Sequence, residues 1–93
     1  MEQRTVTVAA ASGLHARPAA LFVKAATAAP ARVTIRVGDG RAVDARSMLS
    51  VLSLGAKQGT EVTLEADGEH AVAAVDELAA LLATDLDAAP DPA

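Results

Sequence analysis

The sequence predicts a two-layer α+β sandwich whose elements follow the order βαββαβα. Segments in which polar and apolar residues alternate are typical of strands with one buried face, and such segments recur along the chain. Between and after them lie segments whose apolar residues have helical spacing. With 93 residues, of which 52% are hydrophobic, the chain is long enough for one domain with one core. We therefore expect four short strands, at least some of them antiparallel, covered on one face by helices.

The first strand and the first helix are predicted in the N-terminal third of the chain. Residues 4–9 alternate, so that Val6 and Val8 share one face of a strand. Residues 16–28 are rich in helix-forming alanine, and Pro18 is tolerated in a first turn, where its missing N–H costs nothing. The expected inner face of this helix consists of Leu14, Pro18, Leu21, Phe22 and Ala25.

Turn and capping signals divide the middle of the chain. Gly38-Asp39-Gly40 is typical of a hairpin turn. Ser47 and Gly55 are typical of the start and the stop of a two-turn helix. Around these signals we expect strands at 32–37, 41–44 and 60–66 and a helix between Ser47 and Gly55, with Val62 and Leu64 facing inward from the last strand.

The last helix is expected to begin near Glu69 or His70 and to end the domain. Two prolines among residues 88–93 prevent a helix there, so we expect a domain at 1–87 followed by a disordered tail. The apolar residues at helical spacing in the last helix are Val72, Val75, Leu78, Ala79, Leu82 and Leu86.

Composition argues against several classes of protein. The chain has no cysteine, which excludes a disulfide framework and a cysteine zinc site. Phe22 is the one aromatic residue and the net charge is −4, so we expect no nucleic-acid partner. We find neither a signal-peptide pattern nor an apolar run near 18 residues. We therefore expect no membrane insertion and a cytoplasmic location.

The charges divide unevenly along the chain. Residues 1–60 hold all eight lysines and arginines and have a net charge of +5, whereas residues 61–93 have a net charge of −9. A basic face on the first part would favour acidic partners or anions. Alternatively, the acids of the second part merely solvate a C-terminal helix and tail.

His15 directly precedes the start of the first predicted helix. The first N–H groups of a helix have no partner within the helix, so an anion is stabilised beside them. Arg17 offers a planar guanidinium suited to phosphate oxygens, and Gly13 allows the backbone to bend ahead of the histidine. A neutral imidazole is nucleophilic, and its attack on phosphorus gives an N-phosphorylated histidine. This pattern favours the transient carriage of a phosphoryl group. It does not favour a metal site, since no second ligand is near.

A purely structural role for the histidines stays open. A histidine at a helix start is usually only a polar terminal residue. This applies with more force to His70, which lies among acids with no arginine nearby.

Three segments resemble a known family. Residues 13–20, Gly-Leu-His-Ala-Arg-Pro-Ala-Ala, closely resemble the active-site segment of the HPr phosphocarriers of the bacterial phosphotransferase system. Residues 46–55, Arg-Ser-Met-Leu-Ser-Val-Leu-Ser-Leu-Gly, resemble that family's second helix, and residues 58–62 resemble the glycine and strand that follow it. The similarity extends from about residue 4 to residue 82 and implies an open-faced β-sandwich, a four-stranded antiparallel sheet with three helices on one face.

The resemblance also implies roles for residues at the first helix. His15 matches the histidine that accepts the phosphoryl group, on Nδ1. Arg17 matches the arginine that orients and balances this group, assisted by the backbone N–H groups of Ala16 and Arg17. The implied donor is Enzyme I, charged by phosphoenolpyruvate, and the implied acceptors are IIA domains of sugar permeases. The chain would be a monomeric covalent carrier without a cofactor of its own, and not an independent enzyme.

The second helix is implied to meet both partners. Met48, Leu49 and Leu52 match the family's exposed apolar patch, while Val51 and Leu54 are expected in the core. Alternatively, Met48, Leu49 and Leu52 belong to the core as well. Basic residues expected around the patch are Lys24, Arg46 and Lys57.

Ser47 aligns with the serine that some family members phosphorylate for regulation, which would require a serine kinase as a further partner. A phosphoserine at a helix start is tolerated by its own helix yet repels an acidic partner. Alternatively, Ser47 acts only as a helix N-cap.

Other functions remain to be distinguished. Within the family, the chain could serve a nitrogen-related relay or a dihydroxyacetone-kinase relay. It could also be a regulatory binding module of HPr shape that never carries phosphate on histidine. An acylphosphatase-like hydrolase would want an asparagine to position water, and the chain has none.

Overall fold

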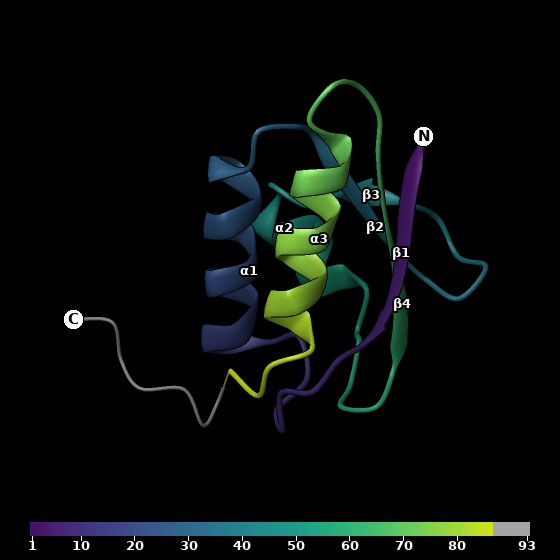
Figure 1. Ribbon diagram of the computed structural model, residues 1–93. Helices are drawn as coiled ribbons and strands as arrows, with labels where there is room; N and C mark the ends of the chain where they lie inside the picture. Colours follow the sequence, from purple (N-terminus) through teal and green to yellow (C-terminus); the bar gives the residue numbers. More distant parts are fainter. Residues whose placement is uncertain (87–93) are drawn as a thin grey trace.

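A four-stranded antiparallel sheet and three helices on one of its faces form the two layers of the computed structural model, which describes residues 1–86 (Figure 1). This architecture confirms the predicted fold class and element order. The elements are β1 (Glu2–Thr7), α1 (Ala16–Ala28), β2 (Val33–Val37), β3 (Val43–Asp44), α2 (Met48–Ser53), β4 (Glu61–Ala66) and α3 (Ala71–Leu82).

The sheet has the strand order β1-β4-β2-β3, with β4 between β1 and β2. Every pair is antiparallel, and Leu64 at the centre of β4 is opposite Arg4 on one side and Ile35 on the other. β1 and β3 are therefore the edge strands, and β3 contributes only two residues.

The alternation of the strands separates an apolar face from a polar one. Val33, Ile35, Val62 and Leu64 are fully buried beneath the helices. On the opposite face, the hydroxyl groups of Thr5 and Thr63 lie 3.3 Å apart, and other strand positions carry charged or hydroxyl side chains. A face of this composition needs no second covering layer, which explains why the sandwich is open.

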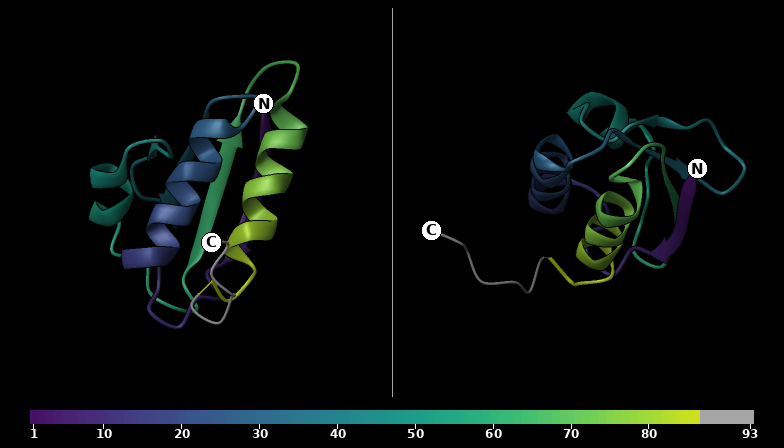
Figure 2. Two further views of the ribbon diagram at one scale, coloured as in Figure 1. Left: turned by 90° about the vertical axis from the view of Figure 1, so that its left-hand side faces the viewer. Right: turned by 45° about the horizontal axis from the view of Figure 1, so that its top comes forward.

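The helices cover the apolar face with α1 between α2 and α3 (Figure 2). The closely packed positions of α1 include two alanines, Ala19 and Ala26, on either side of the buried Phe22. Leu21 and Ala25, which we expected on the inner face, are only half-buried. Small side chains occupy these contacts because they let α1 approach both neighbours closely.

The prediction for the inner face of α3 is wrong at its first position. Val72 is 48% exposed, whereas Ala71 and Ala74 are buried. The helical period that places Val75 inward also selects these two alanines, and it turns Val72 toward solvent. Leu86 is buried as expected, but α3 ends at Leu82, so Leu86 packs from the segment after the helix.

Several predicted boundaries shift by one or two residues. β1 covers residues 2–7 instead of 4–9, because its register pairs Glu2 with Ala66. Val8 lies beyond the strand, although its N–H still reaches the Thr60 carbonyl at 2.9 Å. The return strand shortens from 41–44 to β3, since the turn after Val37 takes up more of the chain than expected. The predicted tail, residues 88–93, and the predicted domain end at residue 87 lie outside the described residues.

Val51 and Leu49 lie in the same helix and offer a matched pair of variants for testing which face of α2 is buried. Val51 is fully buried in α2, while Leu49 is 81% exposed. Val51→Ala should lower the free energy of unfolding by about 2 kcal/mol through lost burial and a cavity. Leu49→Ala should change it by less than about 0.5 kcal/mol. Urea unfolding followed by circular dichroism measures both, and equal losses would contradict this orientation of α2.

Candidate functional site

The loop between β1 and α1 is fixed by a close backbone contact at Gly13. Gly13 is buried, has a φ of +75°, and donates its N–H to the Ala10 carbonyl at 2.9 Å. A Cβ atom there would lie 2.5 Å from the Ala56 carbonyl oxygen. The next residue, Leu14, donates its N–H to that same carbonyl at 2.8 Å. The segment after α2 thus determines where the chain enters α1.

Further hydrogen bonds attach the earlier part of this loop to two distant segments. The Ala9 N–H donates to the Leu82 carbonyl at 3.0 Å, and the Ala9 carbonyl accepts from Gln58 Nε2 at 3.2 Å. The Ala11 N–H donates to Asp85 Oδ1 at 3.4 Å. The loop is therefore held by the end of α3 as well as by the chain after α2.

His15 occupies the N-cap position of α1, with extended dihedral angles (φ −132°, ψ 164°). Its carbonyl accepts the Ala19 N–H at 3.4 Å, but its side chain makes no capping hydrogen bond and is exposed. The imidazole is thus not needed to cap the helix. Its position leaves it accessible to a partner protein.

The turn from His15 into α1 is strained. Ala16 has a φ of +49°, a left-handed conformation that costs an L-residue about 1–2 kcal/mol. The buried side chains of Leu14 and Pro18 lie on either side of this turn and hold it in place. An alanine gives no sequence signal for such a conformation.

Arg17 follows in the first turn of α1 and is half-buried. The structure thus brings the guanidinium-bearing residue, the exposed imidazole and the start of a helix together. At this start the first N–H groups lack a carbonyl one turn earlier. The chemistry of this arrangement suits an anion attached to His15.

α2 presents part of the predicted apolar patch. Its N-cap is Ser47, whose Oγ accepts the Ser50 N–H at 3.3 Å, as the capping signal predicted. Leu49 is strongly exposed, whereas Met48 and Leu52 are half-buried against the core. Leu54, expected in the core, is also only half-buried.

α2 and the His15 loop are neighbours through the residues that follow α2. Ala56 accepts the Leu14 N–H, and Lys57 lies against Gly13. The C-terminal end of α2 therefore lies toward His15, while Arg46 precedes its other end. Lys24 and Lys57 are both exposed, and neither makes an ion pair within residues 1–86.

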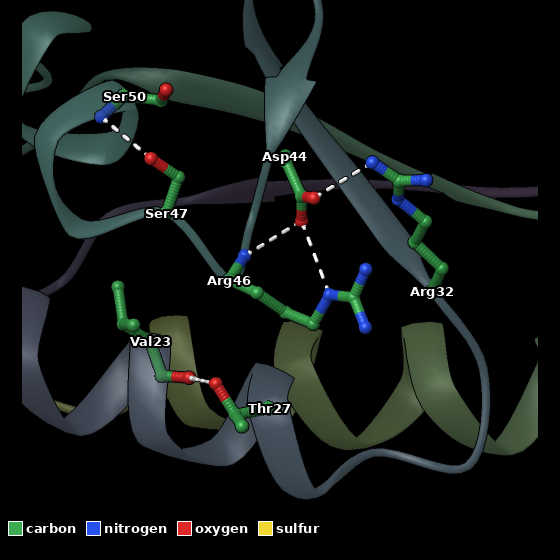
Figure 3. Close-up of polar contacts among 7 residues, drawn as sticks. All are labelled: Val23, Thr27, Arg32, Asp44, Arg46, Ser47 and Ser50. Atoms are coloured by element: carbon green, nitrogen blue, oxygen red, sulfur yellow. Dashed lines mark hydrogen bonds and ion pairs between the residues drawn. The ribbon is translucent and has the colours of Figure 1, made fainter.

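Asp44, which was not among the predicted site residues, holds the segment that leads into α2 (Figure 3). Its carboxylate accepts the Arg46 N–H at 2.9 Å, Arg32 Nη2 at 2.9 Å and Arg46 Nε at 3.5 Å. An aspartate two residues before the N–H that it accepts is a known turn signal, which could have identified this contact. The two guanidinium contacts need tertiary structure. Arg46, expected to border the patch, is thus engaged by Asp44.

These contacts lower the pKa of the Asp44 carboxyl below its ordinary value of 3.8. The largest cause is the hydrogen bond from the Arg46 backbone, and the guanidinium groups of Arg32 and Arg46 add to it. Partial burial acts in the opposite direction.

His70 has a similar local position but different surroundings. It is the N-cap of α3, makes no side-chain capping bond and is exposed. Its sequence neighbours Asp67 and Glu69 are acidic, so that an added phosphoryl group would be repelled there.

The described part of the chain contains neither a metal-binding cluster nor a helix that could span a membrane. Within residues 1–86, no three histidine, aspartate or glutamate side chains gather in a way that could hold a metal ion. None of the helices found there combines the length and the apolar character needed to cross a membrane.

Gly13→Ala should lower the free energy of unfolding by more than about 2 kcal/mol. The left-handed conformation alone costs about 1–2 kcal/mol, and the added Cβ collides with the Ala56 carbonyl. Gly38→Ala is the control, because Gly38 also has a positive φ but has no atom within 4 Å of the added Cβ. Urea unfolding compares the two variants. Equal losses would show that the contact with Ala56 is unimportant.

Asp44→Asn should change how stability depends on pH. Because the pKa of Asp44 is lower in the folded chain than in the unfolded one, its carboxylate stabilises the fold above the ordinary pKa of 3.8. That stabilisation disappears as the pH falls through the lower folded-state pKa. The wild type should therefore be more stable than Asp44→Asn near neutral pH, and the difference should shrink in strong acid. Urea unfolding over a series of pH values measures it. A difference that does not depend on pH would contradict the role of the charge.

Comparisons with known proteins identify the family of this chain. The model of the family described as "PTS HPr component phosphorylation site" matches residues 2–84. The phosphocarrier protein HPr of Streptomyces coelicolor is 52% identical over 91 residues, which cover 98% of each chain. The crystal structure of HPr-C-His from Thermoanaerobacter tengcongensis has a TM-score of 0.86 at 33% identity and covers 97% of this chain and 100% of that one. A crystal structure of an HPr dimer from the same organism has a TM-score of 0.65 at 37% identity and covers 87% of this chain and 92% of that one. This chain belongs to the HPr family of phosphocarriers of the phosphotransferase system.

Proposed function

We propose that this chain accepts a phosphoryl group on His15 from Enzyme I and passes it to IIA domains of sugar permeases. The observation that carries the proposal is the exposed His15 imidazole, which is not used for capping at the start of α1. Membership of the HPr family supports the carrier role in general terms. Enzyme I as the donor, IIA domains as the acceptors and the cytoplasm as the location are parts of what we propose here.

The transfer forms one bond and breaks one bond at phosphorus. The lone pair of His15 Nδ1 attacks the phosphorus atom carried by the donor, and the bond to the donor group breaks with its electron pair. The new group has a charge of about −2, which Arg17 and the N–H groups of Ala16 and Arg17 balance. This chain needs no metal or organic cofactor for that step.

Both transfers use one face of the molecule. Leu49, with Met48 and Leu52 beside it, gives an apolar contact on α2, and the chain after α2 leads directly to the His15 loop. Lys24 and Lys57, which make no ion pair with any residue of the described range 1–86, suit acidic partners. A carrier that meets its partners in succession works as a monomer with short-lived contacts, although the similar structure from Thermoanaerobacter tengcongensis is described as a dimer.

Intact mass spectrometry tests the proposal after incubation with phosphoenolpyruvate, magnesium and Enzyme I. Wild type and His70→Ala should each gain one acid-labile phosphoryl group, and His15→Ala should gain none. His70→Ala is the matched control, because both histidines are exposed N-cap residues without a capping bond. If an adduct formed on His15→Ala, or if wild type gained none while a control carrier did, the proposal would fail.

Leu49→Glu should slow phosphoryl transfer from Enzyme I by about tenfold or more, since a charge replaces an apolar contact. The control is Val72→Glu, which places the same charge at an exposed apolar position on α3. Quenched-flow measurement of the phosphorylated fraction gives both rates. Equal rates for the two variants would place the contact surface elsewhere.

We also propose that Ser47 is a site for regulatory phosphorylation by a serine kinase. An aspartate at this position can still accept the Ser50 N–H, so Ser47→Asp should fold normally. Its added charge lies next to the patch on α2 and should slow transfer from Enzyme I. The control for charge alone is Ala73→Asp, which places the same charge at an exposed position on α3. An unchanged rate in Ser47→Asp would remove the regulatory proposal.

A further inference from the structure

β1 presents the long free edge of the sheet. The strand order places β1 and β3 at the edges, and β3 has only two residues while β1 has six. Unpaired N–H and C=O groups along an edge can template the addition of another strand. The N-terminal edge therefore needs some feature that keeps it unpaired.

The register identifies the backbone groups that point outward from β1. Val8 donates its N–H toward β4, to the Thr60 carbonyl at 2.9 Å. In an antiparallel pair, every second residue directs both of its backbone groups to the same neighbour. The backbone groups of Val6 and Arg4 are thus used by β4, while those of Gln3, Thr5 and Thr7 point away from the sheet.

One of these outward groups is already occupied by a side chain. Arg4 Nη1 donates to the Gln3 carbonyl oxygen at 2.8 Å. Arg4 Nε donates to Asp76 Oδ1 of α3, also at 2.8 Å. An ion pair with the helical layer therefore holds the guanidinium group across the free edge of the strand.

We propose that the Arg4–Asp76 pair guards this edge against pairing with β1 of a second copy of this chain. Apart from this ion pair, the edge of β1 is well suited to pair with the same edge of another copy. Gln3, Thr5 and Thr7 carry exposed, uncharged side chains, and threonine favours strands. A two-fold antiparallel pairing centred on Thr5 would place Gln3 of each copy opposite Thr7 of the other and satisfy all of the outward groups.

Arg4 opposes this pairing in two ways. It occupies the Gln3 carbonyl that the second strand would need. In the two-fold register, Arg4 of each copy also lies diagonally across from Arg4 of the other, so that like charges approach. The Arg4–Asp76 pair does not involve His15. If the test rejects this proposal, the proposed phosphoryl transfer is therefore unaffected.

Sedimentation equilibrium on full-length variants tests the guard. Arg4→Thr should lower the dissociation constant of a dimer by about tenfold or more relative to wild type. The control is Arg36→Thr, which removes the ion pair to Glu65 in the interior of the sheet and should leave association unchanged. Adding Thr5→Pro to Arg4→Thr removes the central outward N–H, which an edge strand tolerates, and should restore the monomer.

Each of three outcomes would contradict the proposed guard. The proposal is overturned if Arg4→Thr associates no more than wild type, if Arg36→Thr associates equally, or if the dimer persists with Thr5→Pro. Circular dichroism checks the fold of each variant. Should Arg4→Thr fail to fold, Arg4→Gln replaces it, because glutamine removes the charge and keeps most of the side chain's length.

Discussion

The candidate site depends on the contact between the backbone at Gly13 and the chain at Ala56. This contact joins the segment before α1 to the segment after α2 at a separation that leaves no room for a Cβ atom. It therefore determines both where His15 emerges and how the C-terminal end of α2 lies beside it. Three residues after Gly13, Ala16 adopts a positive φ between the buried Leu14 and Pro18.

Several ion pairs join segments of the surface around this contact. Asp44 binds Arg32 and Arg46 and fixes the approach to α2, while Arg4 and Asp76 join the edge strand to α3. Surface ion pairs contribute little to stability individually. Their effect here is to fix the positions of the segments that they join. Within residues 1–86, Lys24 and Lys57 take part in no such pair.

Local signals explain why so much of the fold could be predicted. Ser47 and Gly55 bound α2 because capping and a left-handed stop are properties of a few adjacent residues. Val72 was placed wrongly because periodicity shows that a helix has an apolar stripe but does not show which residues around it are covered. The stripe that packs contains alanines, whose hydrophobic signal is weak.

The candidate site was predictable in its residues but not in its geometry. His15 and Arg17 lie in one short segment, so their proximity follows from the sequence. The approach of Ala56 to Gly13 joins residues more than forty positions apart, and the ion pairs of Asp44 likewise depend on how distant segments pack. Nothing in the sequence of Ala16 indicates a positive φ, since alanine normally avoids it.

The most direct test of the account is the ¹H–¹⁵N spectrum of the chain before and after phosphorylation by Enzyme I. If the start of α1 binds the phosphoryl group on His15, the amide signals of Ala16 and Arg17 should show the largest shifts, in the direction of stronger hydrogen bonds. The amides at the start of α3, beside His70, should not move. Unchanged signals at Ala16 and Arg17 in the phosphorylated chain would contradict the account.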